Sequence, residues 1–298
     1  MKKILLALLL IFVMLLSACG GVKYELKDGL MFADGKEATG NFEFKTGKYK
    51  VKGNFVNGLP DGLFEEYYED GSIMAKETFV NGEMTSKELY YKNGNLLGNF
   101  AENGDIKLYY DDGSLILSYD AEKEESTYYH ENGNPFMIGN SNETTLYNEN
   151  NEVVSKLRDD DLTDIGATLR KCGDVNFVEV HDDLTDIGAT LKKLDDGTFE
   201  LVKGDVVIAK IDANGEVINY LYSTGETLLT VNDNTGETEF FFKNGNTFMK
   251  EKEGGSVLNY RDGKPLYEID GDSENIYNEE GDKIVGGFDL VTDIKKLD

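Results

Sequence analysis

FEEYYEDG, at residues 64–71, is the first of four related phrases, followed by KELYYKNG (87–94), IKLYYDDG (106–113) and STYYHENG (126–133). Each phrase is an aromatic run that ends in Asn-Gly or Asp-Gly, dipeptides that tolerate positive φ and are typical of tight turns in β-hairpins. The turn glycines are 9 to 13 residues apart, the length of one strand and its turn: Gly58, Gly71, Gly82, Gly94, Gly104 and Gly113. The pattern predicts an all-β fold, an elongated array of antiparallel β-hairpin repeats.

The composition favours the same fold. The 298 residues include 33 Gly, 17 Tyr and 16 Phe but only 3 Pro and no Trp, which fits many short strands joined by glycine turns. A period this short indicates repeats that pack mainly on their neighbours. The length of the chain therefore reflects the number of repeats and not the number of domains. The formal net charge of −27 repels phosphate backbones, and we expect no nucleic-acid partner.

The first 19 residues have the order of parts of an export signal. Lys2 and Lys3 precede an apolar run from Ile4 to Leu16, which is too short to cross a bilayer comfortably. The run ends at Leu16-Ser17-Ala18-Cys19, which resembles the lipobox of bacterial lipoproteins. The resemblance implies a signal peptide at residues 1–18, a lipid on Cys19 with acyl chains such as palmitate, and a short tether over 19–27.

Lipidation would give the protein a membrane partner and a location. Two or three acyl chains anchor a protein stably where one chain does not. We therefore expect the protein in the bacterial cell envelope, on the outer face of the outer membrane or of the cell membrane. The sequence leaves the choice of membrane and exposure at the cell surface open.

Three blocks follow the tether. A first hairpin array covers residues 28–155, a duplicated block covers 156–203, and a second array covers 204–298. Within the block, residues 160–181 align with 182–203 at 14 of 22 positions. Strands and short helical turns near 160–193 both remain open there. We expect the two arrays to form one continuous ribbon.

Each aromatic phrase carries a pair of adjacent aromatic residues. Neighbouring residues of a strand point to opposite faces, so one Tyr of each pair should face the core and the other water or a partner. Stacked strands would align the outward residues in a ladder that either stabilises the sheet or recognises a protein or glycan. The candidates for this binding surface are Tyr67, Tyr68, Tyr90, Tyr91, Tyr109, Tyr110, Tyr128 and Tyr129.

Residues 53–71 carry a recognisable repeat. Asn57-Gly58, Gly62, Tyr67-Tyr68 and Asp70-Gly71 resemble the MORN-variant repeat, in which aromatic strands end in Asn-Gly. Proteins with such repeats are commonly grouped with YwqK-type antitoxins, so the resemblance implies a scaffold and, as an alternative role, neutralisation of a toxin. A repeat alone does not define a function, because one scaffold can carry unrelated activities.

The sequence shows no motif for catalysis or cofactor binding. His130 and His181 are isolated and are expected to be solvated turn residues, and Cys172 is expected to be a small, half-buried apolar residue. Asp270, Asp272 and Glu274 imitate the start of an EF-hand loop, but the later glycine and glutamate of that loop are missing. We expect no enzyme, no cofactor and no metal site.

The sequence therefore predicts a non-catalytic repeat scaffold or binding module, attached to a membrane by lipid and recognising an unidentified protein or glycan. The alternative is a YwqK-like antitoxin or immunity protein that binds a partner toxin.

Overall fold

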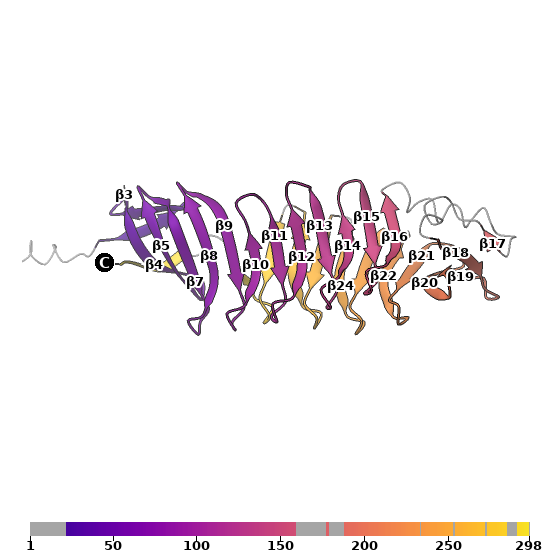
Figure 1. The fold of residues 1–298 in the computed structure, drawn as a ribbon. Coiled ribbons are helices and arrows are strands. Elements are labelled where there is room, and N and C mark those ends of the chain that lie inside the picture. Colours follow the sequence, from indigo (N-terminus) through magenta and orange to yellow (C-terminus); the bar gives the residue numbers. More distant parts are fainter. Residues whose placement is uncertain are drawn as a thin grey trace, which may run out of the picture. The chain divides into compact units, whose positions relative to one another are not determined.

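A computed structural model describes residues 22–158, 177–178, 188–232, 234–252, 254–271, 273–284 and 291–297. Cys19, Cys172, His181 and most of the 156–203 block lie outside the described residues, so the predictions made for them are not addressed. Every described element is a β-strand, and the strands pair antiparallel as hairpins (Figure 1). The all-β prediction is confirmed. No helix long and apolar enough to cross a bilayer occurs among the described residues.

The chain divides into two compact units, of which unit 1 is Met1–Gly94 with Gly287–Asp298 and unit 2 is Asn95–Gly286. The divisions at 94/95 and 286/287 do not coincide with the block boundaries at 155/156 and 203/204. They differ because contacts between strands, and not the repeat pattern, define a compact unit.

Unit 1 contains a small three-stranded sheet and a larger one. The small sheet has β1 (Tyr24–Lys27), β2 (Leu30–Ala33) and β3 (Lys36–Glu37). In the larger sheet the order is β29 (Val291–Lys296), β4 (Gly40–Thr46), β5 (Tyr49–Val56), β7 (Gly62–Tyr67), β8 (Ile73–Val80) and β9 (Glu83–Tyr90), and β6 (Leu59–Pro60) pairs with β5. The C-terminal strand thus pairs with β4 and not with the second array.

Phenylalanines form the core of unit 1. Phe55 lies between Phe42 and Phe64, with ring centroids 5.7 and 5.3 Å away, and Phe64 contacts Phe79 at 4.9 Å. All four rings are buried. Gly53 leaves room for this packing, because a Cβ there would lie 2.2 Å from the Phe64 ring. The glycine of this repeat is therefore needed for side-chain packing.

Unit 2 contains two meanders, in which each strand pairs with the next. The first has β10 (Leu96–Phe100), β11 (Ile106–Tyr109), β12 (Leu115–Asp120), β13 (Glu125–Tyr129), β14 (Pro135–Gly139), β15 (Glu143–Tyr147) and β16 (Val153–Arg158). The second has β17 (Phe177–Val178), β18 (Thr190–Lys193), β19 (Phe199–Lys203), β20 (Val206–Ile211), β21 (Val217–Leu221), β22 (Thr227–Asn232), β23 (Glu237–Phe241), β24 (Thr247–Lys252), β25 (Gly255–Asn259), β26 (Pro265–Asp270), β27 (Ser273–Tyr277) and β28 (Lys283–Ile284).

The two meanders of unit 2 pack face to face (Figure 1). Phe136 on β14 reaches Phe240 on β23 and Phe248 on β24, with ring centroids 5.7 and 5.3 Å apart. The expected continuous ribbon is wrong for this part of the chain. Each meander has one apolar face, and folding the second meander onto the first buries both faces, which the hydrophobic effect favours.

One type of turn needs positive φ at two successive residues. Asn57 has φ of 51° and Gly58 of 82°, as in the type I′ turn whose twist matches that of the flanking strands. Asn and Gly tolerate these angles, which explains the Asn-Gly dipeptide here.

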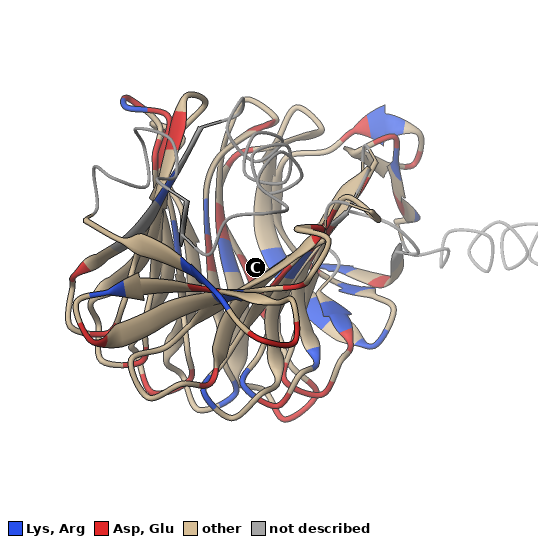
Figure 2. Ribbon diagram, turned by 90° about the vertical axis from the view of Figure 1, so that its right-hand side faces the viewer, with Lys and Arg blue, Asp and Glu red and all other residues tan. Residues whose placement is uncertain are grey.

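The aromatic phrases end in a second type of turn. The N–H of Gly71 donates to the carbonyl of Tyr68 at 3.0 Å, and only the glycine has positive φ. The Asp70 carboxylate accepts from the N–H of Ser72 at 2.9 Å, so the Asp or Asn before the glycine stabilises the turn through its side chain. Many of the Asp and Glu residues lie in the turns (Figure 2).

Candidate functional site

The structure places the two members of the first three tyrosine pairs differently. The second member lies at the start of the turn and is buried: Tyr68, Tyr91 and Tyr110 are 4%, 1% and 3% exposed. The first member is half-buried: Tyr67, Tyr90 and Tyr109. The fourth pair is shifted by one residue, so Tyr128 and Tyr129 are both half-buried and His130 occupies the buried turn position.

The half-buried tyrosines of unit 1 have polar neighbours on their own sheet. The hydroxyl of Tyr67 donates to Glu65 at 2.7 Å, and that of Tyr90 donates to Glu88 at 2.6 Å. The Lys50 ammonium lies 4.8 Å from the centre of the Tyr67 ring. Partial burial and these hydrogen bonds raise the pKa of Tyr67 and of Tyr90 to about 12. These contacts stabilise the sheet and leave part of each ring available to a partner.

The buried turn residues form a series of hydrogen bonds from one hairpin to the next. The hydroxyl donates to a carbonyl in the following turn region, as from Tyr68 to Tyr90 at 2.8 Å and from Tyr222 to Phe241 at 2.8 Å. Tyr260 donates in the same way to Tyr277 at 2.7 Å. Each such bond satisfies a carbonyl at the place where strand pairing gives way to the turn.

His130 takes the place of a turn tyrosine. It is 8% exposed, and its Nε2 lies 3.0 Å from the carbonyl oxygen of Tyr147. A carbonyl only accepts, so Nε2 carries the proton. Burial lowers the pKa of His130, which favours the neutral ring. The prediction that His130 is a solvated turn residue is wrong, because its ring packs between Phe136 and Tyr222 at 5.5 and 5.9 Å.

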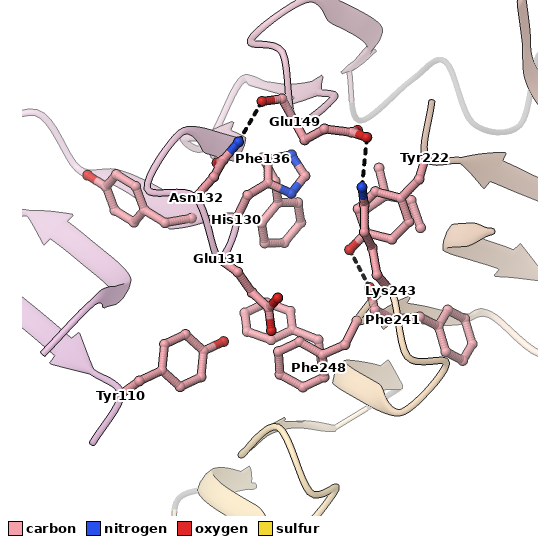
Figure 3. Close-up of a pocket in the computed structure, with 13 residues that line it drawn as sticks. Tyr110, His130, Glu131, Asn132, Phe136, Glu149, Tyr222, Phe241, Lys243 and Phe248 are labelled. Carbon is pink, nitrogen blue, oxygen red and sulfur yellow. Dashed lines mark hydrogen bonds and ion pairs between the residues drawn. The ribbon is translucent and has the colours of Figure 1, made fainter. Parts of the chain in front are cut away.

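A cavity of about 190 Å³ lies beside His130, between the two meanders of unit 2 (Figure 3). Its wall is mainly aromatic, with charged and amide side chains from the neighbouring turns. The lining residues are Tyr110, Tyr129, His130, Glu131, Asn132, Phe136, Glu149, Tyr222, Leu228, Phe241, Phe242, Lys243 and Phe248.

Tyr110 departs from the other turn tyrosines. Its hydroxyl makes no hydrogen bond within the described part of the chain, and it points toward the middle of the lining residues (Figure 3). The Arg261 guanidinium lies 3.9 Å from the centre of its ring, and the ring of Phe242 lies 6.4 Å away. The hydroxyl is therefore available at the cavity.

Glu149 joins the two meanders at the cavity. Its Oε1 accepts from the Lys243 ammonium at 2.9 Å and from the Ser223 hydroxyl, and its carbonyl accepts from Asn132 at 2.8 Å. Burial raises the pKa of Glu149, but the hydrogen bonds from Ser223 and Lys243 outweigh it and bring the pKa to about 2. Glu149 is thus ionised. Its Oε2 is buried and has no hydrogen-bond partner among the described residues.

Arg261 makes a second connection between the meanders. Its guanidinium lies 3.0 Å from Asp112 and 3.1 Å from Glu131. Hydrogen bonds from Ser114 and from Arg261 lower the pKa of Asp112 to about 2. The carboxylate of Glu131 also points toward the middle of the lining residues (Figure 3). The cavity therefore combines aromatic walls with the carboxylates of Glu131 and Glu149.

Unit 1 buries a separate polar cluster. Glu66 and Glu77 are 3% and 6% exposed, and Lys87 lies 2.8 Å from Glu77. Glu66 Oε2 has no hydrogen-bond partner among the described residues. Burial, with the charge of Glu77, raises the pKa of Glu66 to about 8. Glu66 is therefore largely protonated near neutral pH.

Of the eight tyrosines predicted as a binding surface, Tyr110 and Tyr129 line the cavity, but the cavity itself and its charged residues were not predicted. Glu149 and Lys243 are 94 residues apart, and only the pairing of the two meanders brings them together. The one signal in the sequence is YYH at 128–130, where the repeat carries an extra aromatic residue and replaces the turn tyrosine. No cluster of three or more His, Cys, Asp or Glu side chains suited to a metal ion occurs among the described residues.

Comparison with known proteins supports one of the sequence interpretations. Residues 60–81, from β6 to the turn after β8, match the MORN repeat variant, which confirms the repeat at that place. No curated protein matches the chain.

Three solved structures show a weak similarity. A mutant TCP10 domain of CPAP from Danio rerio is 16% identical over 70% of this chain and 95% of its own, with a TM-score of 0.25. The G-box domain of the microcephaly protein CPAP is 13% identical over 76% of this chain and 92% of its own, with a TM-score of 0.22. Alternansucrase in complex with isomaltononaose is 14% identical over 88% of this chain and 18% of its own, with a TM-score of 0.15. What the comparisons establish for this chain is a repeat of the MORN-variant type.

Proposed function

We propose that this protein is a non-catalytic binding module, held by lipid at Cys19 on the outer face of a bacterial membrane, and that unit 2 captures its ligand in the cavity. The lipobox-like sequence before Cys19 supports the anchor. The hairpin repeats support a scaffold, because their strands hold the lining side chains in fixed positions.

The aromatic cavity between the two meanders carries this proposal. A concave site with apolar walls and a few converging polar groups is the usual form of a small-ligand site. The lining histidine donates to a carbonyl, and Glu149 is ionised and bonded to Lys243. This arrangement suits binding better than proton transfer, because the His130 proton is held by a carbonyl and the Glu149 carboxylate carries none.

The anchor is tested by comparing wild type with Cys19→Ala in intact cells treated with protease. We expect wild type to fractionate with membranes and to be labelled by a lipid precursor, and the variant to lose both properties. Protection of wild type until the envelope is broken would place it inside the envelope. A cytoplasmic location of both proteins would refute the anchor.

Ligand capture is tested with the full mature chain and with Tyr222→Ala, which removes one aromatic wall. Both proteins are incubated with a small-molecule and peptide extract of the envelope, washed, and analysed by native mass spectrometry. We expect a bound mass on wild type that is absent from the variant. A bound mass of equal occupancy on both proteins would refute the cavity as the site.

A second function is favoured by the MORN-variant match at residues 60–81, since proteins of this repeat type are grouped with YwqK-like antitoxins. Under this alternative, the chain is an antitoxin or immunity protein that binds a partner toxin. Deletion of its gene would then be tolerated only when the gene for the toxin is deleted as well. Normal growth of the single deletion under conditions where the toxin is made would exclude this role.

A further inference from the structure

Oxygen atoms that can accept a hydrogen bond point into the cavity. Glu149 Oε2 is buried without a partner among the described residues, and an ionised carboxylate can only accept. The Tyr110 hydroxyl and the Glu131 carboxylate also point toward the middle of the lining residues (Figure 3). The Lys243 ammonium is already held by Glu149 Oε1. A ligand with N–H or O–H donors would be complementary to these oxygen atoms.

The aromatic faces around the cavity already hold cations of the chain itself. Arg261 lies over Tyr110 at 3.9 Å, and the Lys243 ammonium lies over Tyr222 at 5.3 Å. Such contacts are attractive because the faces of aromatic rings are electronegative. Phe136 also lines the cavity, and its aromatic ring can contact the carbon atoms of a ligand.

The charges at the cavity leave an excess of one negative charge. The two lining carboxylates, of Glu131 and Glu149, meet one lining cation, Lys243, which gives 1 − 2 = −1. The neutral His130 does not change this sum. A ligand with one positive charge would balance it.

The size of the cavity limits the ligand further. A dry cavity of about 150 Å³ accommodates benzene, so 190 Å³ suits a ligand of about six to eight heavy atoms. This is the size of a short alkyl chain with a polar end.

We infer that the cavity of unit 2 binds a primary alkylammonium group, whose N–H donors reach the Tyr110 hydroxyl and the Glu131 carboxylate and whose carbon chain packs against the aromatic wall. The inference rests on the proposed binding function and specifies its ligand class. Two sources share this chemistry: a free alkylamine and the lysine side chain of a polypeptide.

The first test measures binding to the full mature chain by isothermal titration calorimetry, with three probes. We expect n-butylammonium to bind at least about tenfold more tightly than 1-butanol, because charge-assisted hydrogen bonds are lost with the ammonium group. Tetramethylammonium, which has no N–H donor, should also bind more weakly. Equal affinity for 1-butanol and n-butylammonium would overturn the inference.

The second test removes one of the two negative charges of the cavity lining. Glu149→Gln should weaken n-butylammonium binding by about tenfold or more, whereas Glu102→Gln should leave it unchanged. Glu102 is the matched control because it removes the same charge from an exposed turn of the same unit, on the opposite edge of the meander. An equal loss in both variants would reveal general attraction of cations and overturn the site.

Glu149→Gln also removes a contact between the meanders, so its melting temperature is compared with that of wild type. If it does not fold, Tyr110→Phe provides the test, because it deletes only a hydroxyl that makes no hydrogen bond within the described residues. We expect a loss of at least about threefold in n-butylammonium affinity. Unchanged affinity in a folded Tyr110→Phe variant, together with an unfolded Glu149→Gln variant, would overturn the inference.

Competition identifies the source. N-acetyl-lysine amide should displace n-butylammonium if the ligand is a lysine side chain, and its norleucine analogue, which lacks only the ammonium group, should not. Failure of the lysine derivative alone would assign the site to free amines. Failure of every amine to bind would overturn the inference but leave the proposed binding function intact, because the capture experiment does not assume the chemistry of the ligand.

Discussion

Phe136→Ala should destabilise both meanders of unit 2 together. Phe136 is 3% exposed, and its ring contacts Tyr128 and His130 in its own meander and Phe240 and Phe248 in the opposite one. Truncation of a buried Phe to Ala costs about 3–5 kcal/mol, through lost burial and the cavity that remains. This is a large part of the 5–15 kcal/mol by which a typical domain is stable.

The loss of stability should appear in thermal unfolding and in amide hydrogen exchange. For a unit of this size, each kcal/mol lowers the melting temperature by about 2–4 °C, so we expect a decrease of roughly 6–20 °C. Val206→Ala is the matched control, because Val206 lies in the same unit but is 49% exposed. Its effect should remain within about 0.5 kcal/mol.

Amide hydrogen exchange, measured for separate peptides, distinguishes two meanders that share one core from two independent sheets. If the meanders share one core, amides of β13–β15 and of β22–β24 should lose protection by the same free energy. Loss of protection confined to β13–β15, with wild-type protection in β22–β24, would refute the reasoning, because it would show that the second meander is stable without the first.

Three further predictions concern unit 1. Gly53→Ala should lower the free energy of unfolding by about 1–3 kcal/mol in a denaturant titration, because the new Cβ would lie 2.2 Å from the Phe64 ring, and an unchanged midpoint would contradict this packing. Glu66 has a pKa raised to about 8, so its folded form keeps a proton that the unfolded chain loses near pH 4.5. Stability from this group is therefore fully present below about pH 4.5 and is lost as the pH rises toward 8, and Glu66→Gln should flatten stability over that window; parallel curves would argue against a raised pKa. Tyr67→Ser with Tyr90→Ser should abolish partner binding without changing the far-ultraviolet spectrum if the outward tyrosines recognise a protein or glycan, and retained binding would leave them a structural role.

The hairpins could be predicted because their turns are determined locally. The Asp70 side chain accepts from Ser72 two residues later, and Gly71 supplies the positive φ that the turn needs. Both requirements are visible as Asp-Gly in the sequence. The alternation of buried Tyr68 and half-buried Tyr67 follows equally from the geometry of a strand that enters a turn.

The pairing of the two meanders could not be predicted in this way. Repeats of similar sequence have similar apolar faces, so the sequence does not show which face covers which. Contacts such as that between Phe136 and Phe248 join residues more than 100 positions apart. The alignment of β29 with β4 is of the same kind, because it depends on where the chain returns and not on local propensity.

The cavity arises where the repeat departs from its own pattern, and this suggests how such sites can be found in repeat proteins. In regular turns the tyrosine hydroxyl donates a hydrogen bond to a carbonyl of the next hairpin, as Tyr68 does to Tyr90. The extra aromatic residue at 128–130 puts His130 in that position, and the hydroxyl of Tyr110 in the preceding turn makes no such bond within the described residues. In such a regular turn the tyrosine hydroxyl is therefore not available to a ligand. Where an irregular repeat follows a regular one, a polar atom can be left without a hydrogen-bond partner. Such atoms are the first place to look for a function.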